Sequence, residues 1–342
     1  QKVIEESGST LLPDELKKVA FESAGKLADA VDYTGAGTVE FIFSLKDQAV
    51  YFMEMNTRLQ IEHPVTEKVT GVDIVRAQFD IAAGKSIRDL KWQEKGYAME
   101  LRINAEKPEI QPDGSLAFIP APGKVKEYVF PERDYIDILS AIDAGVEIPP
   151  YYDSMVMQLI CTGEDRNDCI EKLSAYLDEV KITGVYTNLR FLKAILDDEV
   201  FRSGEYDTGY LPEFFKRKDM EKLIREIEES SDAQPQNIDS SVIRIADSDE
   251  LKVLAQSTAV FYRTPAPSEP EFVKVGDVVT VDDTLCLLEA MKLFRPLSLA
   301  MYNSGPAPLY PPDQKYEIVR INPANGQAIN PGDILFIIKP VS

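Results

Sequence analysis

One short unit occurs twice in the last quarter of the chain. The stretches GDVVTVDDTLCLLE and GQAINPGDILFIIK lie fifty residues apart and share a glycine, an aspartate and an apolar strand. The matched positions are Gly276, Asp283, Leu285, Leu287 and Leu288 in the first copy and Gly326, Asp333, Leu335, Ile337 and Ile338 in the second. A repeated turn and strand predicts a small all-β unit, a flattened barrel or sandwich with pseudo-two-fold symmetry, over residues 251–342.

The two copies differ in the residues after the strand. The first continues into LEAMKL, which places Lys292 directly after an apolar run, whereas the second continues into Lys339 and a proline. A charged side chain at Lys292 gives up apolar contact unless something is attached to it. The segment EAMK also fits a turn of a surface helix, but the repeat and the β-rich composition favour an exposed hairpin tip.

Composition and charge limit the classes of partner. The chain has 342 residues, 44% hydrophobic and 28% charged, which is typical of two or three globular domains. A net charge of −21 argues against nucleic acid or an anionic membrane as a general partner, and no run approaches the ~18 apolar residues of a membrane span. Three cysteines and one histidine give no zinc spacing, so we expect reduced thiols and a cytoplasmic protein, with a targeting segment upstream of Gln1 left open.

The first two-thirds of the chain mixes helix and strand patterns, which predicts an α+β fold. Helical patterns occupy residues 11–31, 72–85, 165–180 and 187–198, and two strands over 35–43 and 49–56 are joined by the turn SLKDQ. After Lys216 a short apolar stripe beginning at Met220 predicts a docking helix, and the polar, acidic stretch ESSDAQPQNIDSS has the composition of a linker.

The two strands form a candidate metal site. With the turn centred near Asp47, antiparallel pairing places Glu40 opposite Glu54, and Asn56 lies on the same face as Glu54. Two opposed carboxylates repel unless a cation or a proton lies between them, and with an amide oxygen they form the ligand set that Mg²⁺ takes beside substrate phosphates. The alternative is a solvated hairpin face on which the two acids diverge, and the spacing by itself leaves both readings open.

The next segment along the chain concentrates polar groups. Arg58, Gln60 and Glu62 alternate with Leu59 and Ile61, which predicts three polar side chains on one face and two apolar ones toward the core. A guanidinium, an amide and a carboxylate on one face suit the binding of a small planar oxyanion and the removal of its proton. His63, the single histidine, precedes a proline, and we interpret it as a structural residue whose ring bonds a backbone group.

These residues stand in segments that resemble the C-terminal half of biotin carboxylase, an ATP-grasp enzyme. The resemblance covers residues 1 to about 215 and is carried by several independent stretches, namely GAGTVEFIF, VYFMEMNTRLQIEHPVTEKVTGVDIV, MELRINAEKP, FIPAPGKV, PPYYDSMVMQLI and VYTNLRFLKAIL. It implies an ATP-grasp segment over 1–90 and a biotin carboxylase C-terminal domain over 91–217. The acidic linker then spans 218–250.

The resemblance also implies roles for individual residues. Glu40, Glu54 and Asn56 would hold the Mg²⁺ (or Mn²⁺) of ATP, while Arg58, Gln60 and the backbone of Ile61 would hold bicarbonate. Glu62 would be the base that deprotonates bicarbonate, and Arg102 would stabilise the enolate-like oxygen of biotin. The implied reaction transfers a phosphoryl group from ATP to bicarbonate and releases CO₂ beside biotin, which makes the protein a ligase.

Two departures from the family pattern stand out. The family's Gly-rich phosphate loop, its ATP-contacting lysines and its N-terminal domain are absent, so we expect the segment from Gln1 to lack a full ATP site and to be part of a longer polypeptide. Where the family often has an Arg-x-acidic-Ser segment, the chain has Asp137, Ile138, Leu139 and Ser140, which puts biotin-side or subunit contacts there in doubt.

EAMK resembles the attachment motif of biotinyl (biotin carboxyl carrier) domains, which implies covalent biotin on Lys292 and modification by a biotin protein ligase. The stretch AVFYRTPAPSEPEFVKVGDVV resembles the protruding thumb of the acetyl-CoA carboxylase carrier domain. The segment 304–315 looks like an insertion between the two repeats. Only some thirty residues separate YDTGYLPEFF from the first β strand, too few for a carboxyltransferase domain, so that activity is expected on a separate subunit.

The sequence therefore predicts a biotin carboxylase fused to its carrier, which performs the first half-reaction of acetyl-CoA carboxylase in fatty acid synthesis and forms a homo-oligomer, a dimer or larger. Another biotin-dependent carboxylase, of the propionyl-CoA, methylcrotonyl-CoA or pyruvate type, is the alternative enzyme. A biotinylated scaffold without catalysis is the alternative from another class of protein. The set of Glu40, Glu54, Asn56, Arg58, Glu62 and Arg102 argues against the scaffold.

Overall fold

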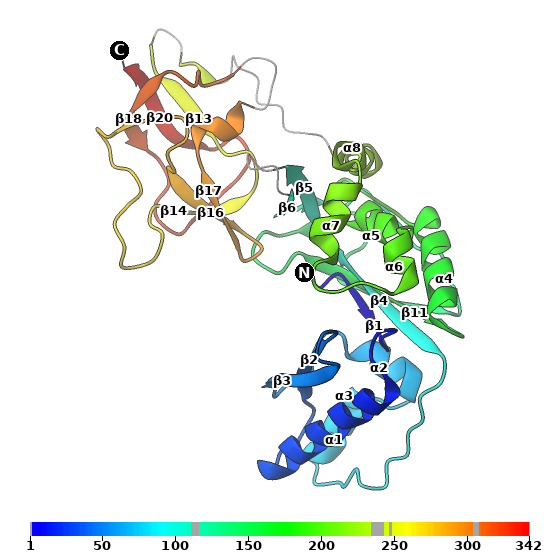
Figure 1. Ribbon diagram of the computed structural model, residues 1–342. Coiled ribbons are helices and arrows are strands. Elements are labelled where there is room, and N and C mark those ends of the chain that lie inside the picture. The colour runs from blue at the N-terminus through cyan, green and yellow to red at the C-terminus, as the bar shows by residue number, and fades with distance from the viewer. Residues whose placement is uncertain (1, 111–115, 234–242, 246–247, 304–307, 342) are drawn as a thin grey trace.

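Two large hydrophobic cores lie at different places along the chain. The computed structural model describes residues 2–110, 116–233, 243–245, 248–303 and 308–341 (Figure 1). One core gathers side chains between Met99 and Ile227, and the other gathers side chains between Ile243 and Ile338. Met291 is the exception, because it lies in the second sequence region but packs into the first core.

The N-terminal part is a hairpin flanked by helices. Strands β2 (Thr38–Ser44) and β3 (Ala49–Asn56) pair with each other, and the helices of this part are α1 (Asp14–Ala30), α2 (His63–Thr70) and α3 (Ile74–Ala82), of which α1 contacts β3. The predicted helices and strands are confirmed here within a few residues. Pro13 is the N-cap of α1, so the acidic first turn follows the proline directly.

The central part is built on an antiparallel sheet. Its strands run in the order β1 (Ile4–Glu6), β4 (Tyr97–Asn104), β11 (Met155–Gly163) and β9 (Ile136–Ser140). The shorter strands of this part are β5 (Glu106–Ile110), β6 (Leu116–Pro120), β7 (Gly123–Lys124), β8 (Glu127–Val129), β10 (Glu147–Ile148) and β12 (Lys181–Thr183). Its helices are α4 (Arg166–Glu179), α5 (Leu189–Leu196), α6 (Glu199–Ser203) and α7 (Tyr210–Arg217).

A further helix changes the extent of the predicted linker. Residues Met220–Ser231 form α8, whose Leu223 and Ile227 are buried in the core of the central part. The apolar stripe therefore forms the docking helix that the sequence indicates, at the start of the predicted linker 218–250. Residues 234–242 and 246–247 of the predicted linker lie outside the described residues.

The C-terminal part consists of two four-stranded antiparallel sheets around one core. The first sheet has the order β13 (Leu251–Leu254), β20 (Ile334–Val341), β18 (Lys315–Ile321), β15 (Val278–Val279). The second has the order β17 (Leu293–Leu297), β16 (Cys286–Ala290), β14 (Ala259–Tyr262), β19 (Gln327–Ile329). The repeated strands β16 and β20 occupy the same position in the two sheets, as pseudo-two-fold symmetry requires.

The repeated glycine and the repeated aspartate have matching structural roles. Gly276 and Gly326 both have positive φ, 94° and 77°. A residue with a side chain would be strained in this backbone conformation. The carboxylate of Asp283 accepts from the amide of Thr280 at 2.6 Å, and that of Asp333 accepts from the amide of Asn330 at 2.7 Å. The repeat thus preserves the turn that leads into each apolar strand.

The insertion between the repeats contributes to the core of the C-terminal part. Residues 304–307 lie outside the described residues, but Tyr310, further along the insertion, is fully buried. Its hydroxyl donates to the carbonyl oxygen of Lys252 at 2.7 Å, and the Asn303 side chain bonds both the amide and the carbonyl of Tyr310. This part of the insertion therefore fills space between the sheets.

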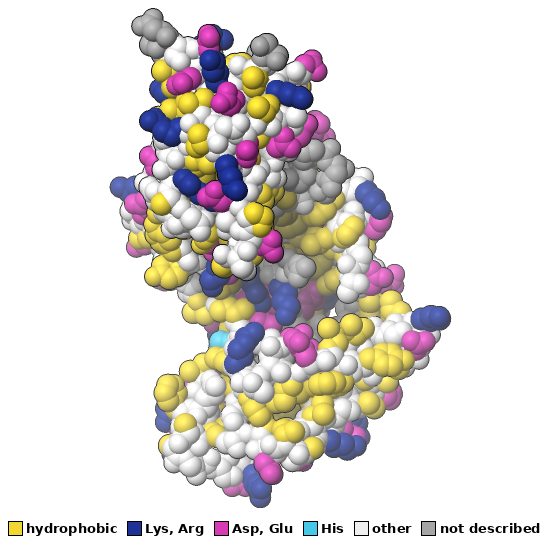
Figure 2. Space-filling model, turned by 90° about the vertical axis from the view of Figure 1, so that its left-hand side faces the viewer, with side chains coloured by type: hydrophobic (Ala, Val, Ile, Leu, Met, Phe, Trp, Pro, Cys, Tyr) yellow, Lys and Arg dark blue, Asp and Glu magenta, His cyan; other side chains and the backbone are white. Residues whose placement is uncertain are grey.

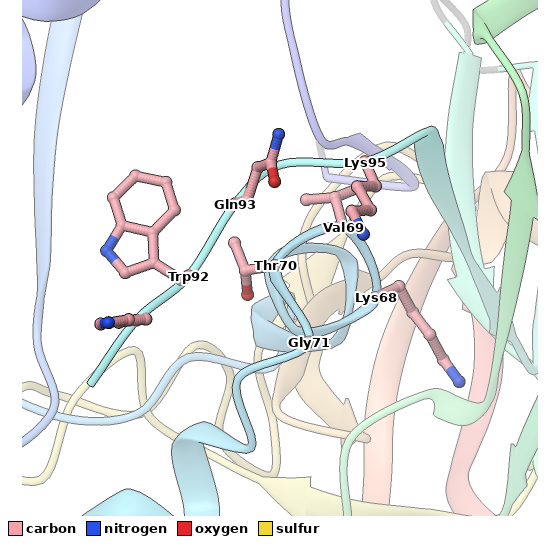
Figure 3. A pocket seen from close by; sticks show the side chains of 8 residues that line it. Lys68, Val69, Thr70, Gly71, Trp92, Gln93 and Lys95 are labelled. Carbon is pink, nitrogen blue, oxygen red and sulfur yellow. The ribbon is translucent and has the colours of Figure 1, made fainter. Parts of the chain in front are cut away.

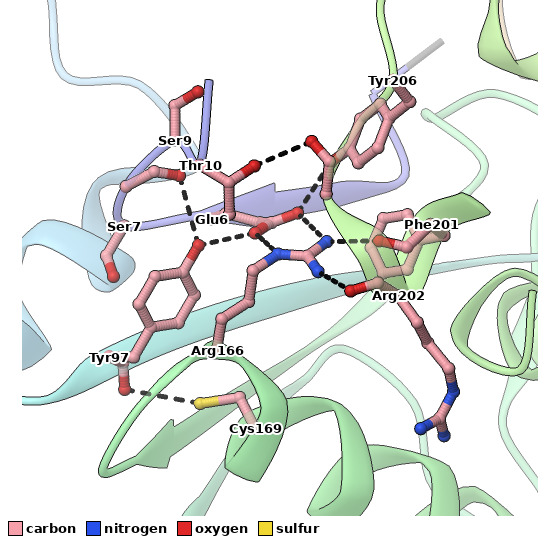
Figure 4. A network of polar contacts seen from close by, with 12 residues as sticks. Glu6, Ser7, Ser9, Thr10, Tyr97, Arg166, Cys169, Phe201, Arg202 and Tyr206 are labelled. Carbon is pink, nitrogen blue, oxygen red and sulfur yellow. Dashed lines mark hydrogen bonds and ion pairs between the residues drawn. The ribbon is translucent and has the colours of Figure 1, made fainter. Parts of the chain in front are cut away.

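A buried ion pair ties the first strand to the central helices (Figure 4). The Glu6 carboxylate accepts from Nε and Nη2 of Arg166 at 2.7 and 3.0 Å, and from the hydroxyls of Tyr97 and Tyr206 at 2.6 and 2.7 Å. The same guanidinium donates to two backbone carbonyls at the end of α6, each at 2.9 Å. Burial and the Glu6 charge raise the pKa of both tyrosines, so both hydroxyls stay protonated donors.

We expect Arg166→Ala to lower the free energy of unfolding of the central part by about 3–5 kcal/mol, because it leaves the Glu6 carboxylate buried without its cation. Chemical denaturation followed by circular dichroism measures the change. The exposed pair of Arg133 and Glu179 provides the control, and Arg133→Ala should change stability little. Equal losses in the two variants would contradict the role given to the buried pair.

Candidate functional site

The hairpin brings the predicted metal ligands together. Glu40 pairs with Glu54 across β2 and β3, as predicted, and a bulge follows Glu40. The side-chain amide of Asn56 donates to Glu40 Oε1 at 2.9 Å and to Glu54 Oε1 at 3.1 Å. The three side chains therefore converge and do not diverge into solvent.

This arrangement fits a hard divalent cation. Two carboxylates approach one amide, and turning the Asn56 amide over would present a third oxygen in the same place. Gln60, which is buried, donates to Glu40 Oε1 at 3.1 Å and so orients that carboxylate. The residues present therefore suit Mg²⁺ or Mn²⁺.

The segment from Arg58 to Glu62 does not form the predicted alternating strand. A turn at Ile61 and Glu62 leads into α2, whose N-cap is Glu62. Ile61 is 38% exposed and does not face the core, which corrects the prediction, while its carbonyl accepts from the Gln158 side chain at 2.9 Å. Arg58 is exposed and donates to the neighbouring Leu59 carbonyl at 3.3 Å, so it does not share a face with Gln60. The helix start interrupts the two-residue period on which the prediction depended.

Arg102 lies between two carboxylates. Its Nη2 is 3.0 Å from Glu62 Oε2 and 2.6 Å from Glu5 Oε1. Strand pairing explains the placement, because Ile4 pairs with Leu101 and so brings β1 alongside the residue that the sequence singles out. The Nε of Arg102 is buried and has no hydrogen-bond partner among the described residues.

Lys2 and Glu5 are two charged residues that the sequence analysis missed. Lys2 Nζ lies 3.7 Å from Glu62 Oε1 and 3.8 Å from Glu40 Oε1, and thus joins the metal cluster to the candidate base. Neither residue stands near the hairpin in the sequence. Only the pairing of β1 with β4 brings them to the site, and no local pattern signals it.

Burial raises the pKa of Glu5 to about 7, against the opposing pull of Arg102. The nearby carboxylates of Glu100 and Glu62 add to the rise by like-charge repulsion. Burial also raises the pKa of Glu100, although the Gln158 amide donates to it at 2.7 Å. Three carboxyls thus surround one guanidinium in this part of the site.

The Glu5 carboxyl makes stability depend on pH. Its folded-state pKa lies above the usual 4.5, so its stabilising contribution is present at low pH and is lost as pH rises through about 7. We expect the difference in unfolding free energy between Glu5→Gln and wild type to increase in favour of the variant by up to about 3 kcal/mol from pH 5 to pH 8. Urea denaturation at several pH values measures it, with the exposed Glu205→Gln as control. A difference that does not change with pH would contradict this pKa.

The single histidine has the structural role expected of it. His63 Nδ1 lies 2.8 Å from the carbonyl oxygen of Gln60, a bond to the backbone, as predicted. His63 is also the first residue of α2. It therefore helps to fix the turn that places Gln60 and Glu62.

The other end of α2 borders a separate cavity. Lys68, Val69, Thr70 and Gly71 line a space of about 460 Å³ together with Lys91, Trp92, Gln93 and Lys95 (Figure 3). Lys68 also pairs with Asp137, the first residue of the stretch that departs from the family pattern. None of the predicted site residues lines the cavity, so it is not the site of the predicted chemistry.

Lys292 lies at the tip of a tight hairpin. Ala290 pairs with Leu293, which leaves Met291 and Lys292 as a two-residue turn. Both have positive φ, 51° and 65°, the backbone that such a turn requires and that non-glycine residues seldom adopt. Lys292 is exposed, so its amine is accessible at the end of the hairpin.

No helix in the described part of the chain is both long enough and apolar enough to cross a membrane.

Comparison with known families identifies two segments. Residues 1–90 match the family described as carbamoyl-phosphate synthase L chain, ATP binding domain, and residues 100–213 match the biotin carboxylase C-terminal domain. Biotin carboxylase 1 of Bacillus subtilis is 44% identical over 214 residues, 62% of this chain and 46% of that protein. One of the pyruvate carboxylase subunits of Methanothermobacter thermautotrophicus is 41% identical over 233 residues, 67% of this chain and 46% of that protein. The chain thus spans about half the length of these curated relatives.

Solved structures agree with this assignment. The biotin carboxylase of Campylobacter jejuni superposes with a TM-score of 0.58 at 37% identity, over 62% of this chain and 46% of that one. A single-chain, multi-domain long-chain acyl-CoA carboxylase superposes with a TM-score of 0.58, over 100% of this chain and 31% of that one. Its identity is 24%, so that likeness concerns the fold alone. Over residues 1–90 and 100–213 the chain is therefore similar to the ATP-binding and C-terminal domains of biotin carboxylases.

Proposed function

We propose that the protein carboxylates biotin carried on its own Lys292, with ATP and bicarbonate as substrates. The observation that carries the proposal is the convergence of Glu40, Glu54 and Asn56 beside a Glu62–Arg102 pair in biotin carboxylase domains. The exposed hairpin lysine at the end of a repeated strand supports the carrier half. We assign the ATP-grasp segment to 1–90, the biotin carboxylase C-terminal domain to 91–217, the linker to 218–250 with α8 docked at its start, and the carrier to 251–342.

The hairpin cluster would hold the metal of MgATP. Glu40 and Glu54 would bind it through their carboxylates and Asn56 through its amide oxygen. When bound, the ion would neutralise charge on the phosphates and orient the transferred group. Gln60 holds the Glu40 carboxylate in place, and Lys2 supplies a positive charge between this cluster and Glu62.

The second half of the site would handle bicarbonate and the acceptor. Arg58, Gln60 and the backbone of Ile61 would bind bicarbonate, for which the exposed Arg58 side chain has to turn toward Gln60. Glu62 would then take the proton of bicarbonate on its carboxylate. Arg102 would donate to an oxygen that becomes negative on biotin.

The features around the carrier favour an acetyl-CoA carboxylase type of enzyme acting in fatty acid synthesis. The loop between β14 and β15 carries three prolines and is closed at its base by the Phe272 amide, which donates to the Arg263 carbonyl at 2.9 Å. Arg263 itself is anchored on the carbonyl of Pro323 at 2.9 Å. A stiff, anchored excursion of this kind is what a thumb would require. The similarity to a pyruvate carboxylase subunit makes a 2-oxo acid the alternative acceptor.

The proposed function requires several partners. A carboxyltransferase on a separate subunit would use the carboxylated carrier, a biotin protein ligase would modify Lys292, and the chain would act in the cytoplasm as a homo-oligomer. Hydrophobic side chains gather on the N-terminal part in Figure 2. Exposed hydrophobic residues of this part include Phe21 of α1, Phe52 of β3 and Phe79 of α3, of which Phe79 is 71% exposed. Such a surface suits packing against a further segment or subunit.

Incorporation of ¹⁴C from bicarbonate into the protein tests the proposed function. The full-length protein, biotinylated in the cell, is incubated with MgATP and ¹⁴C-bicarbonate, and acid-labile label on the chain is counted. We expect labelling only when ATP and bicarbonate are both present. Adding a carboxyltransferase with acetyl-CoA, propionyl-CoA or pyruvate then identifies the acceptor from the labelled product. A biotinylated chain that takes up no label would leave the scaffold as the better reading.

A further inference from the structure

Met291 connects the two large parts of the chain. It stands at the tip of the β16–β17 hairpin, yet it is only 2% exposed and packs with the core of the central part. Its amide donates to the carbonyl oxygen of Pro150 at 2.6 Å, in the loop just before β11. A methionine is suited to fill an irregular apolar pocket of this kind, because its side chain is unbranched and flexible.

The hairpin makes a second contact with the central part, through β17. Arg295 on β17 donates to the Glu109 carboxylate on β5 at 2.7 Å, and both side chains are partly shielded from solvent. The hairpin is therefore held at two points, by a buried anchor with a backbone hydrogen bond and by an ion pair. A charge-assisted bond and a buried apolar anchor together are the features of a specific interface.

Exposed apolar residues border the contact on both sides. Tyr151 and Tyr152 follow Pro150, while Leu293 and Phe294 follow Lys292, and all four are exposed. Lys292 itself is exposed while its neighbour Met291 is covered. The docked hairpin thus leaves the lysine amine free but hides one of the residues next to it.

We propose that Pro150 and Glu109 form a docking surface for the β16–β17 hairpin of the same chain, and that a ligase can modify Lys292 only after the hairpin leaves it. The docking depends on the contacts alone, whereas the consequence for Lys292 rests on the proposed carrier function. An enzyme that modifies the tip has to approach around Met291, and this residue is covered in the docked state. Docking of the hairpin on Pro150 and its modification by the ligase therefore exclude each other.

Hydrogen exchange tests the docking in the full chain without biotin. We expect the Met291 amide to exchange roughly tenfold or more faster in Glu109→Arg, because like charges then face each other at Arg295. Arg295→Glu combined with Glu109→Arg should restore slow exchange, and Arg295→Ala should speed it. The exposed Glu132→Arg is the control and should leave exchange unchanged. Fast exchange in wild type, or no recovery in the reversed pair, would overturn the docking surface.

The rate of biotinylation by a biotin protein ligase tests the consequence. We expect a several-fold faster rate in Glu109→Arg and a rate close to wild type in the reversed pair. Unchanged rates with altered exchange would overturn the competition between docking and modification. A wild-type chain that shows slow Met291 exchange but never accepts biotin would refute the carrier function and leave the docking intact, so the two failures are distinguishable.

Discussion

Glu62→Gln is expected to lower bicarbonate-dependent ATP cleavage by the full-length protein roughly 10²–10⁴-fold, the contribution usual for a positioned general base. The amide is nearly the same size and can still accept from Arg102 Nη2, which now lies 3.0 Å from the carboxylate. It cannot take up the proton of bicarbonate. The loss should therefore appear in kcat, while the affinity for ATP changes little.

The exposed Glu205→Gln is the matched control and should keep full activity. Unfolding of Glu62→Gln by urea should resemble that of wild type, since the turn at the start of α2 depends on the backbone and on His63. An active Glu62→Gln enzyme would exclude this residue as the base. Ready ATP cleavage by wild type in the absence of bicarbonate would instead contradict the assigned substrate.

Lys292→Arg is expected to abolish the streptavidin signal of the protein expressed with a biotin protein ligase. Arginine keeps the positive charge and fits the same turn, but its guanidinium remains protonated near neutral pH and is a poor nucleophile for forming an amide. The loss should be complete, because Lys292 is the single attachment site that we propose.

Lys339→Arg is the matched control for this substitution. Lys339 belongs to the second copy of the repeat, but it pairs with Glu317 inside the sheet and lies at no hairpin tip. Its replacement should leave the signal unchanged. Biotin that persists in Lys292→Arg would show that another residue is modified, and the carrier assignment would then be wrong.

Features that depend on short stretches of sequence were predictable. The pairing of Glu40 with Glu54 follows from the turn length, and the bond from His63 to the backbone agrees with the structural role expected of a histidine before a proline. The repeat predicted matching strands, which the structure has at the same position of two sheets. The period of a strand and the length of a turn fix such features locally.

The prediction for Arg58 to Glu62 was wrong because a local period was extended too far. The alternation from Arg58 to Glu62 stops because α2 begins there, so Ile61 faces solvent. The docking helix predicted from the stripe at Met220 is confirmed, but the sequence did not indicate the core of the central part in which its Leu223 and Ile227 are buried. Burial against distant elements decides such a partner.

The sequence by itself determined the kinds of residue at the site, the hairpin register and the lysine that ends the first repeated strand. Tertiary structure decided which charges meet. Lys2 and Glu5 reach Glu62 and Arg102 only because β1 pairs with β4. Met291 is buried only because the hairpin tip rests on Pro150. Contacts between residues far apart in the chain follow from how whole elements pack to bury apolar surface, and no local pattern encodes that packing.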